Sequence, residues 1–398
     1  MNHILNSKSC DPPKGLVFDL RQNPGGLLTS AVDVASLFVP KGADIVSAKG
    51  RGFPSLLYRS RVDPLVSPDT KVVVLVSGST ASAAEIVSGA IQDHDVGVIL
   101  GSDRTYGKGL VQNVEELPFD TALKFTVAKY YTPSGRCIQS TKYTEGGGKN
   151  PEKSSFIATK IEEKDRGDFY TRGGRLVRDG GGIEADMKVA PPKASALEVS
   201  LLRANLLNDY AAKWSTNHEI TNDNIFGISD DTYNDFQKFV LEKQEKKEVD
   251  LLGQIYGQPF ETLRKALKQS EYTHSLKLEL EALQASILRE MKSDFVKYRT
   301  DIKEDLEQAI LARYLPESML IERAITHDVQ VNAASKLISN GQKFNTILAR
   351  NSPSETTGSY TAGKQLASDQ KSKMVTDTFG VSPLEDERDI GVRINLKF

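Results

Sequence analysis

Residues 71–90 have the sequence KVVVLVSGSTASAAEIVSGA, and this stretch decides the fold class of the first half of the chain. Its first six residues are apolar after the lysine and rich in valine, which is typical of a buried strand. Apolar residues then recur at positions 83, 86, 87 and 90, at helical spacing. The stretch therefore predicts a strand, a short turn of small residues, and a helix.

The same alternation begins upstream of this stretch. Residues 15–20, GLVFDL, predict a strand, and apolar positions 28, 31, 35 and 38 predict a helix. Strand, helix, strand, helix in succession predicts right-handed crossover units on a partly parallel sheet. Residues 122–131, ALKFTVAKYY, alternate with period two and place Leu123, Phe125 and Val127 on one face, which predicts a half-buried strand.

The composition changes along the chain and suggests three segments. Residues 141–184 are rich in glycine and charge, which predicts a long, mobile surface excursion. After Pro191 and Pro192, long charged stretches carry apolar residues at helical spacing. We therefore expect an α/β core over 1–192, a helical domain over 193–345, and a polar tail over 346–398 that is disordered.

Bulk properties exclude several classes of function. The 398 residues carry a formal charge of −2, so no net field draws the chain to nucleic acid or to an anionic membrane. The two cysteines lack zinc or redox spacing, and no run approaches the roughly 20 apolar residues of a membrane span. The first predicted strand follows the start almost at once, without a targeting segment, so we expect an N-terminally incomplete protein.

Two turns carry residues that suit acyl-transfer chemistry. Ser82 lies between the strand and the helix of the central stretch, where the amide of Ala83 could stabilise an oxyanion. Glu85 follows three residues later, so Ser82 fits a helix capping box equally well. Gly25 and Gly26, which end the upstream strand, could present a second amide or could simply form a turn that needs positive φ.

Lys108 stands between two glycines in TYGKG, a setting that has three possible interpretations. The spacing departs from a phosphate-binding loop, and Gly109 replaces the residue that would hold magnesium. A lysine that is removed from water has a lowered pKa and can act as a general base for serine; the alternative is an exposed loop lysine. His94 is 12 residues past Ser82, about 18 Å along a helix, and therefore too distant to be the base. No metal or other cofactor is implied.

The runs DLRQNPGGLL, VLVSGSTASAAEIVSGAIQD, TYGKGLVQ and LKFTVAKYYTPSGRCIQ, in this order, resemble the carboxyl-terminal processing peptidases, or tail-specific proteases. The resemblance spans about residues 15–189, where GGIEADMKV is similar to the closing core strand of that family. It implies a mixed α/β (α+β) peptidase core of the ClpP/crotonase type. It also implies a serine endopeptidase that cleaves proteins at or near their C-termini.

The site residues follow from the resemblance. It implies that Ser82 is the nucleophile, that Lys108, 26 residues later, is the base, and that Gln112 orients the lysine. The oxyanion hole would use the amide of Ala83 and one of Gly25 and Gly26, and the residues alone do not say which. Ser77 and Ala84 depart from the asparagine and serine that relatives often carry at these positions.

The resemblance also sets expectations for partners and location. The family ordinarily has further core strands and a PDZ domain before DLRQNPGG, and the sequence given includes neither. Substrates would be polypeptides, and relatives act in the periplasm, cell envelope or thylakoid lumen. The helical segment resembles an extension that aids assembly in some members, for example into a homo-oligomer; the alternative is a solvated bundle without a ligand. Competing hypotheses are an inactive fragment or scaffold protein that keeps the fold, and a small-ester hydrolase.

Overall fold

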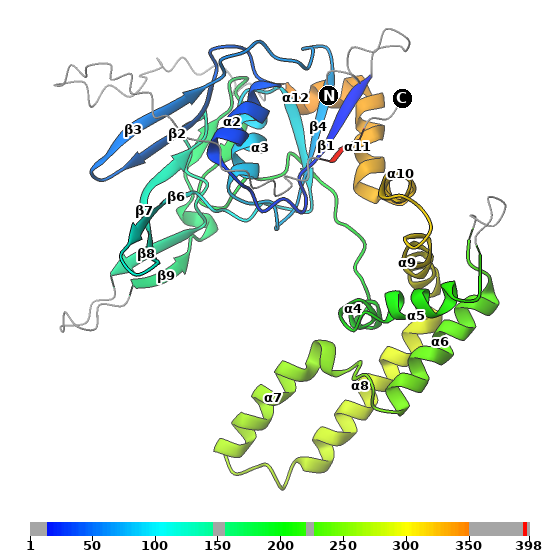
Figure 1. The fold of residues 1–398 in the computed structure, drawn as a ribbon. Helices are drawn as coiled ribbons and strands as arrows, with labels where there is room; N and C mark the ends of the chain where they lie inside the picture. Colours follow the sequence, from blue (N-terminus) through cyan, green and yellow to red (C-terminus); the bar gives the residue numbers. More distant parts are fainter. Residues whose placement is uncertain (1–13, 146–155, 220–226, 350–392, 396–398) are drawn as a thin grey trace. The chain divides into compact units, whose positions relative to one another are not determined.

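The computed structural model describes residues 14–145, 156–219, 227–349 and 393–395. The chain divides into two compact units, one formed by Met1–Pro191 with Val329–Phe398 and the other by Pro192–Asp328. The first unit combines sheets and helices, and the second is helical (Figure 1). The predicted fold class, an α/β core followed by a helical domain, is confirmed.

The strands are β1 (Gly15–Asp19), β2 (Asp44–Gly50), β3 (Phe53–Arg59), β4 (Lys71–Val76), β5 (Gly97–Gly101), β6 (Leu110–Leu117), β7 (Thr121–Tyr131), β8 (Thr141–Glu145), β9 (Phe156–Lys160), β10 (Asp168–Tyr170), β11 (Leu176–Arg178), β12 (Met187–Lys188) and β13 (Arg393–Asn395). The helices are α2 (Leu28–Ser36), α3 (Ala83–Asp93), α4 (Ala196–Arg203), α5 (Leu206–Ser215), α6 (Asp230–Glu245), α7 (Gly253–Gln269), α8 (Lys277–Lys297), α9 (Arg299–Leu311), α10 (Glu317–His327), α11 (Val329–Ser339) and α12 (Gly341–Leu348), with a 3-10 turn η2 (Glu163–Asp165).

The central sheet has the strand order β12-β5-β4-β1-β13. Strand β4 pairs in parallel with β1 and β5, and β12 pairs in parallel with β5. Strand β13 closes the other edge antiparallel to β1. Val72 to Val76 are at most 1% exposed, because helices cover both faces of the parallel strands. The predicted crossover arrangement is therefore present.

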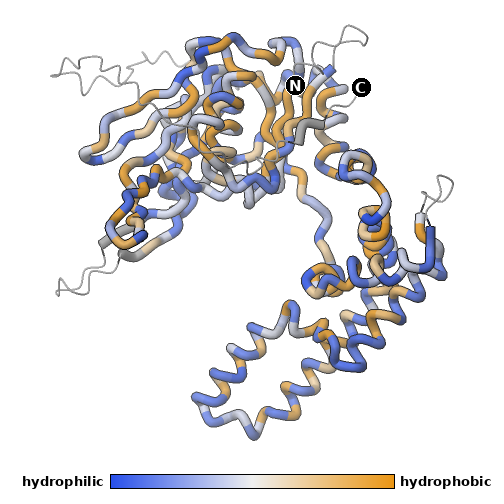
Figure 2. Tube along the Cα trace, viewed as in Figure 1, coloured by the Kyte–Doolittle hydropathy of each residue, from blue (hydrophilic) through white to orange (hydrophobic). Residues whose placement is uncertain are grey.

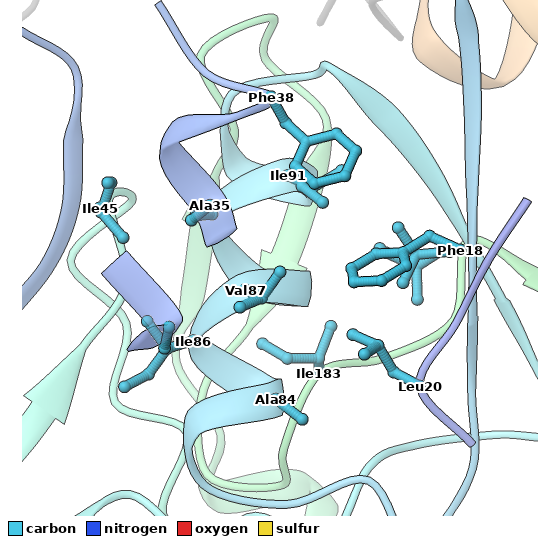
Figure 3. Close-up of a cluster of buried hydrophobic side chains, with 14 of the residues drawn as sticks. Phe18, Leu20, Ala35, Phe38, Ile45, Ala84, Ile86, Val87, Ile91 and Ile183 are labelled. Carbon is cyan, nitrogen blue, oxygen red and sulfur yellow. The ribbon is translucent and has the colours of Figure 1, made fainter. Parts of the chain in front are cut away.

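Helix α3 is the centre of the main hydrophobic core. Every residue of α3 is buried, and Val87 and Ile91 point toward Phe18 and Phe38, whose rings stack at 5.5 Å (Figure 3). Burying one such large side chain stabilises the fold by about 2 kcal/mol. Helices α2 and α3 cover one face of the parallel sheet, and α11 and α12 cover the other, with α11 against β1 and β4 and α12 against β5 (Figure 1). The core thus holds the first turn of α3 rigidly at the end of β4.

A second, antiparallel sheet has the order β3-β2-β7-β6. Strands β6 and β7 form a long hairpin, whereas β2 pairs with β7 only from Ser47–Tyr131 to Lys49–Lys129. Leu123 is 51% exposed, and Phe125 and Val127 are half-buried. The strand was predicted correctly, but the start of its apolar face stays exposed.

The described residues of the range 141–184 form more regular structure than predicted. They contain β8 to β11, and Ile183 at their end is fully buried in the main core. Arg175 anchors the segment through ion pairs of 2.6 Å with Asp95 and with Asp186, beneath the end of α3. The prediction of a long surface excursion is therefore wrong for residues 166–184, which pack on the core, whereas residues 158–160 and 162–165 are exposed as expected. Residues 146–155 lie outside the described residues.

The second unit contains α4 to α10 around an aromatic core. Tyr210, Phe236 and Phe295 are buried and meet edge to face. Hydrophobic and hydrophilic residues alternate along the helices (Figure 2). The division after Asp328 places α11 and α12 with the first unit, whereas the helical domain was expected to reach 345. Of the predicted disordered tail, 350–392 and 396–398 lie outside the described residues, α12 extends to Leu348, and 393–395 form β13.

Candidate active site

Ser82 lies in a strained turn between β4 and α3. Its φ and ψ are 55° and −117°, a combination that costs a non-glycine residue about 1–3 kcal/mol. Ser195 and Ser229 begin other helices with the ordinary extended geometry, φ near −66° and ψ of 164°. A serine on a sharp strand-to-helix turn is typical of a nucleophile that must be presented to a substrate. Capping alone does not account for this strain.

The glycine turn of residues 23–26 packs directly against the turn of Ser82. Gly25 has φ +100°, and a Cβ there would lie 2.7 Å from the carbonyl oxygen of Ala81 and 2.8 Å from the nitrogen of Ala83. Only glycine fits this close approach. The Gly25 amide donates to Asn23 Oδ1 at 2.9 Å. Among the described residues the amides of Gly26 and Ala83 have no acceptor, so these two remain available to an oxyanion.

A small apolar cavity adjoins these amides. Its lining includes Gly25, Gly26 and Ala83 on one side and Phe18 and Leu20 on the other. Its volume is about 30 Å³. A space of this size and polarity suits a small apolar group rather than a charged one.

Glu85 ties the serine turn to the lysine loop. Its carboxylate is fully buried and accepts from the amides of Ser82 (2.8 Å), Gly107 (2.7 Å) and Lys108 (2.9 Å), and from the Thr105 hydroxyl. Burial raises the pKa of Glu85, and the donated hydrogen bonds partly oppose that rise. Sequence reasoning assigned this residue only to a capping box, because the spacing from Ser82 was its one visible signal.

Backbone hydrogen bonds join the candidate motifs. The Ala81 amide donates to the Asn23 carbonyl at 3.0 Å, and the Tyr106 amide donates to the Thr80 carbonyl at 2.9 Å. The Thr80 hydroxyl also donates to the Leu20 carbonyl at 2.7 Å. Turns that are far apart in sequence therefore meet at the carboxyl ends of β1 and β4.

The side chains of Lys108 and Gln112 are exposed. Within the described part of the chain, no hydrogen bond joins the Lys108 amine to the Ser82 hydroxyl. The register of the β6–β7 hairpin shifts between Val111 and Gln112, where β7 has the extra residue Val127, and such irregularities often redirect side chains beside active sites. Hydrogen bonds to its backbone thus anchor the lysine loop. The described residues do not shield the Lys108 amine from water.

His94 caps the far end of α3, with Nε2 2.6 Å from the Asp44 carbonyl oxygen, so α3 separates it from Ser82. The described residues include no group of His, Cys, Asp or Glu side chains suited to a metal ion.

Within the described residues, no helix is long and apolar enough to cross a bilayer.

Comparison with known proteins shows which proteins the segment around this site is similar to. Residues 2–146 match the profile of "Peptidase family S41". This segment is therefore similar to peptidase family S41. Residues 197–338 match "Probable PDZ-protease, C-terminal helical domain". The S41 segment includes Ser82, Lys108 and Gln112, and the predicted resemblance to the carboxyl-terminal processing peptidases is confirmed.

Relatives of the S41 segment include two curated processing proteases. The "Carboxy-terminal-processing protease" of Bartonella bacilliformis is 44% identical over 135 residues, which cover 34% of this chain and 30% of that protein. The "C-terminal processing peptidase, chloroplastic" of Tetradesmus obliquus is 41% identical over 121 residues, covering 30% and 25%. The solved "photosystem II D1 C-terminal processing protease" is 40% identical, with 32% of each chain covered and a TM-score of 0.30. The matches therefore span less than a third of these relatives.

Proposed function

We propose that this chain carries the catalytic core of a serine endopeptidase that cleaves polypeptides at or near their C-termini. Ser82 is the nucleophile, Lys108 the general base and Gln112 the residue that orients the lysine. The observation that carries the proposal is the strained Ser82 turn, which Glu85 joins to the backbone of Lys108. The amides of Gly26 and Ala83 form the oxyanion hole, and Gly25 provides the close approach between the two turns.

The chemistry proceeds through an acyl-enzyme. The neutral Lys108 amine takes the proton of the Ser82 hydroxyl while Oγ attacks the substrate carbonyl carbon. The two amides hold the oxyanion, and Lys108 returns the proton to the leaving amine as the C–N bond breaks. Water then loses a proton to Lys108 and attacks the acyl group, and Ser82 Oγ leaves with that proton.

To act as the base, the Lys108 amine must be shielded from water, and the described residues do not shield it. Catalytic hydrogen bonds are often long in the absence of substrate and tighten when the substrate binds. We therefore assign the covering of Lys108 to the bound polypeptide or to further protein outside the residues described. The small apolar cavity beside Gly26 takes a small apolar substrate side chain.

The same proposal includes the compartment of the protein and the role of its helical domain. A relative is named as chloroplastic, and this supports an exported or lumenal protease. We propose that residues 1–192 act as the catalytic core and that the helical domain over 193–345 serves assembly. Recognition of the substrate C-terminus, the task of a PDZ domain, falls to a part other than the described residues.

A second candidate is an inactive scaffold that keeps the peptidase fold. The exposure of Lys108 favours it, because the general-base role requires a lysine side chain that is removed from water. This candidate predicts a folded chain whose Ser82 never reacts.

The test is covalent labelling of the purified chain with a fluorophosphonate probe, followed by intact mass. We expect one adduct on the wild type and none on Ser82→Ala or Lys108→Ala, with Lys124→Ala as a matched lysine control that labels normally. A folded wild type without an adduct would contradict the proposal and support the scaffold. Peptide substrates then separate a peptidase from a small-ester hydrolase.

A further inference from the structure

A groove opens where β2 and β7 separate. Their ladder ends at the pair Lys49–Lys129, and from there to Thr121 strand β7 is paired only with β6. A Cβ on Gly50 would lie 2.0 Å from the Val127 carbonyl oxygen, so the chain crosses β7 closely before it turns away. The groove that results has a volume of about 1060 Å³.

The charged residues of this groove are all cationic. Lys49, Arg51 and Lys129 line it, and no carboxylate does. Within the described residues none of the three has a carboxylate within ion-pair distance, although Lys49 lies 5.3 Å from the centre of the Tyr131 ring. Lys49 and Lys129 stand directly opposite each other in the ladder, an arrangement that destabilises a sheet. The groove therefore holds positive charge that the described fold does not neutralise.

The hairpin beside the groove exposes apolar side chains. Leu123 on β7 is 51% exposed, and Val114 and Leu117 on β6 are 57% and 43% exposed. A free strand edge that carries exposed apolar side chains is a template for the addition of another strand. Backbone pairing and apolar contacts are thus both available along β7.

We propose that an extended, acidic segment of a polypeptide binds here as an added strand along β7, with its carboxylates against Lys49, Arg51 and Lys129. Lys49 and Lys129 lie where the ladder ends and Arg51 follows two residues after Lys49, so the cations stand at one end of the free edge of β7, where they suit the side-chain carboxylates of a segment that pairs there. Gln112 and Leu110 line the same groove, so a segment bound there lies beside the proposed site. As a statement about substrates, the inference rests on the proposed function.

Binding is tested in the full chain carrying Ser82→Ala, so that no turnover occurs. The probe is a fluorescent peptide in which glutamate alternates with valine, compared by anisotropy with its glutamine counterpart and with a copy whose backbone is N-methylated at alternate residues. We expect the acidic peptide to bind about tenfold or more tightly than the glutamine peptide, and the N-methylated copy to lose binding. Added salt should weaken the binding of the acidic peptide.

Charge variants locate the site. Combined Lys49→Gln, Arg51→Gln and Lys129→Gln should abolish the preference for the acidic peptide, whereas Lys124→Gln, a lysine of the same strand outside the groove lining, should keep it. Circular dichroism confirms that both variants are folded. Equal binding of the two peptides, an unchanged affinity in the triple variant, or tighter binding of a single-stranded oligonucleotide would overturn the inference. Fluorophosphonate labelling of chains that retain Ser82 reports the proposed function separately.

Discussion

Ser82 and Lys108 donate their backbone amides to the same oxygen atom, Oε2 of Glu85, at 2.8 and 2.9 Å. The two residues are 26 positions apart in the sequence, and a single buried carboxylate sets the relative position of their main chains. The geometry of the proposed nucleophile and base thus depends on a third side chain that takes no part in the proposed proton transfers.

Glu85→Gln tests this dependence. The amide keeps the side-chain volume but places an NH₂ group against backbone donors, so buried N–H groups lose their acceptor. We expect the free energy of unfolding, measured in urea, to fall by about 2 kcal/mol and fluorophosphonate labelling of Ser82 to be lost. Glu116→Gln, an exposed acid on β6, should change stability by less than about 0.5 kcal/mol. Wild-type stability in Glu85→Gln would refute the role of this carboxylate.

Comparing Gly25→Ala with Gly42→Ala separates the cost of backbone strain from the cost of a steric collision. Gly25 and Gly42 both have positive φ, +100° and +82°, but only at Gly25 would a Cβ meet other atoms within 4 Å. Gly42→Ala should therefore cost about 1 kcal/mol from φ alone. Gly25→Ala should cost about 3 kcal/mol or more, because the serine turn must also move. The thermal or urea unfolding of the two variants gives the comparison, and equal losses would show that the turns are not in close contact.

Ser82→Gly should be more stable than Ser82→Ala. The strain of φ 55° and ψ −117° costs about 1–3 kcal/mol with a Cβ and little without one. Glycine also makes the unfolded chain more flexible, which lowers the free energy of unfolding by about 0.4–1 kcal/mol. We therefore expect the free energy of unfolding of Ser82→Gly to exceed that of Ser82→Ala by about 1 kcal/mol. Urea unfolding of the two variants, neither of which can label, measures the difference. A less stable glycine variant would mean that the turn is not strained.

Asp305 should make the stability of the helical unit depend on pH. Burial, and then the nearby Glu198, Asp301 and Glu304, raise its pKa from 3.8 to about 6. Because the folded pKa is the higher one, this contribution to stability is complete below pH 3.8 and is lost as the pH rises through about 6. Asp305→Asn should flatten that slope and raise the melting temperature near neutral pH. Glu290→Gln, an exposed acid on α8, should leave the slope as it is.

Local patterns predicted the elements that build the core. Apolar runs identified β1 and β4, and helical spacing identified α2 and α3. Each of these elements buries one or both of its faces, so its apolar residues form a pattern within a short stretch of sequence. The ordered structure of residues 166–184 was missed, because Arg175 and Ile183 anchor them through partners that are distant in the sequence. The placement of α11 and α12 with the first unit was missed for the same reason.

The sequence by itself determined which family residues 15–189 resemble, the candidate residues Ser82, Lys108 and Gln112, and the order of the core elements. These depend on motifs and periodicity, which are local properties of the chain. Only the tertiary structure decided that Glu85 joins the two turns, that Gly25 uses its amide on Asn23, and that the Lys108 side chain stays exposed. Hydrogen-bond partners and exposure to water depend on which distant segments pack together, and a linear pattern does not specify that packing.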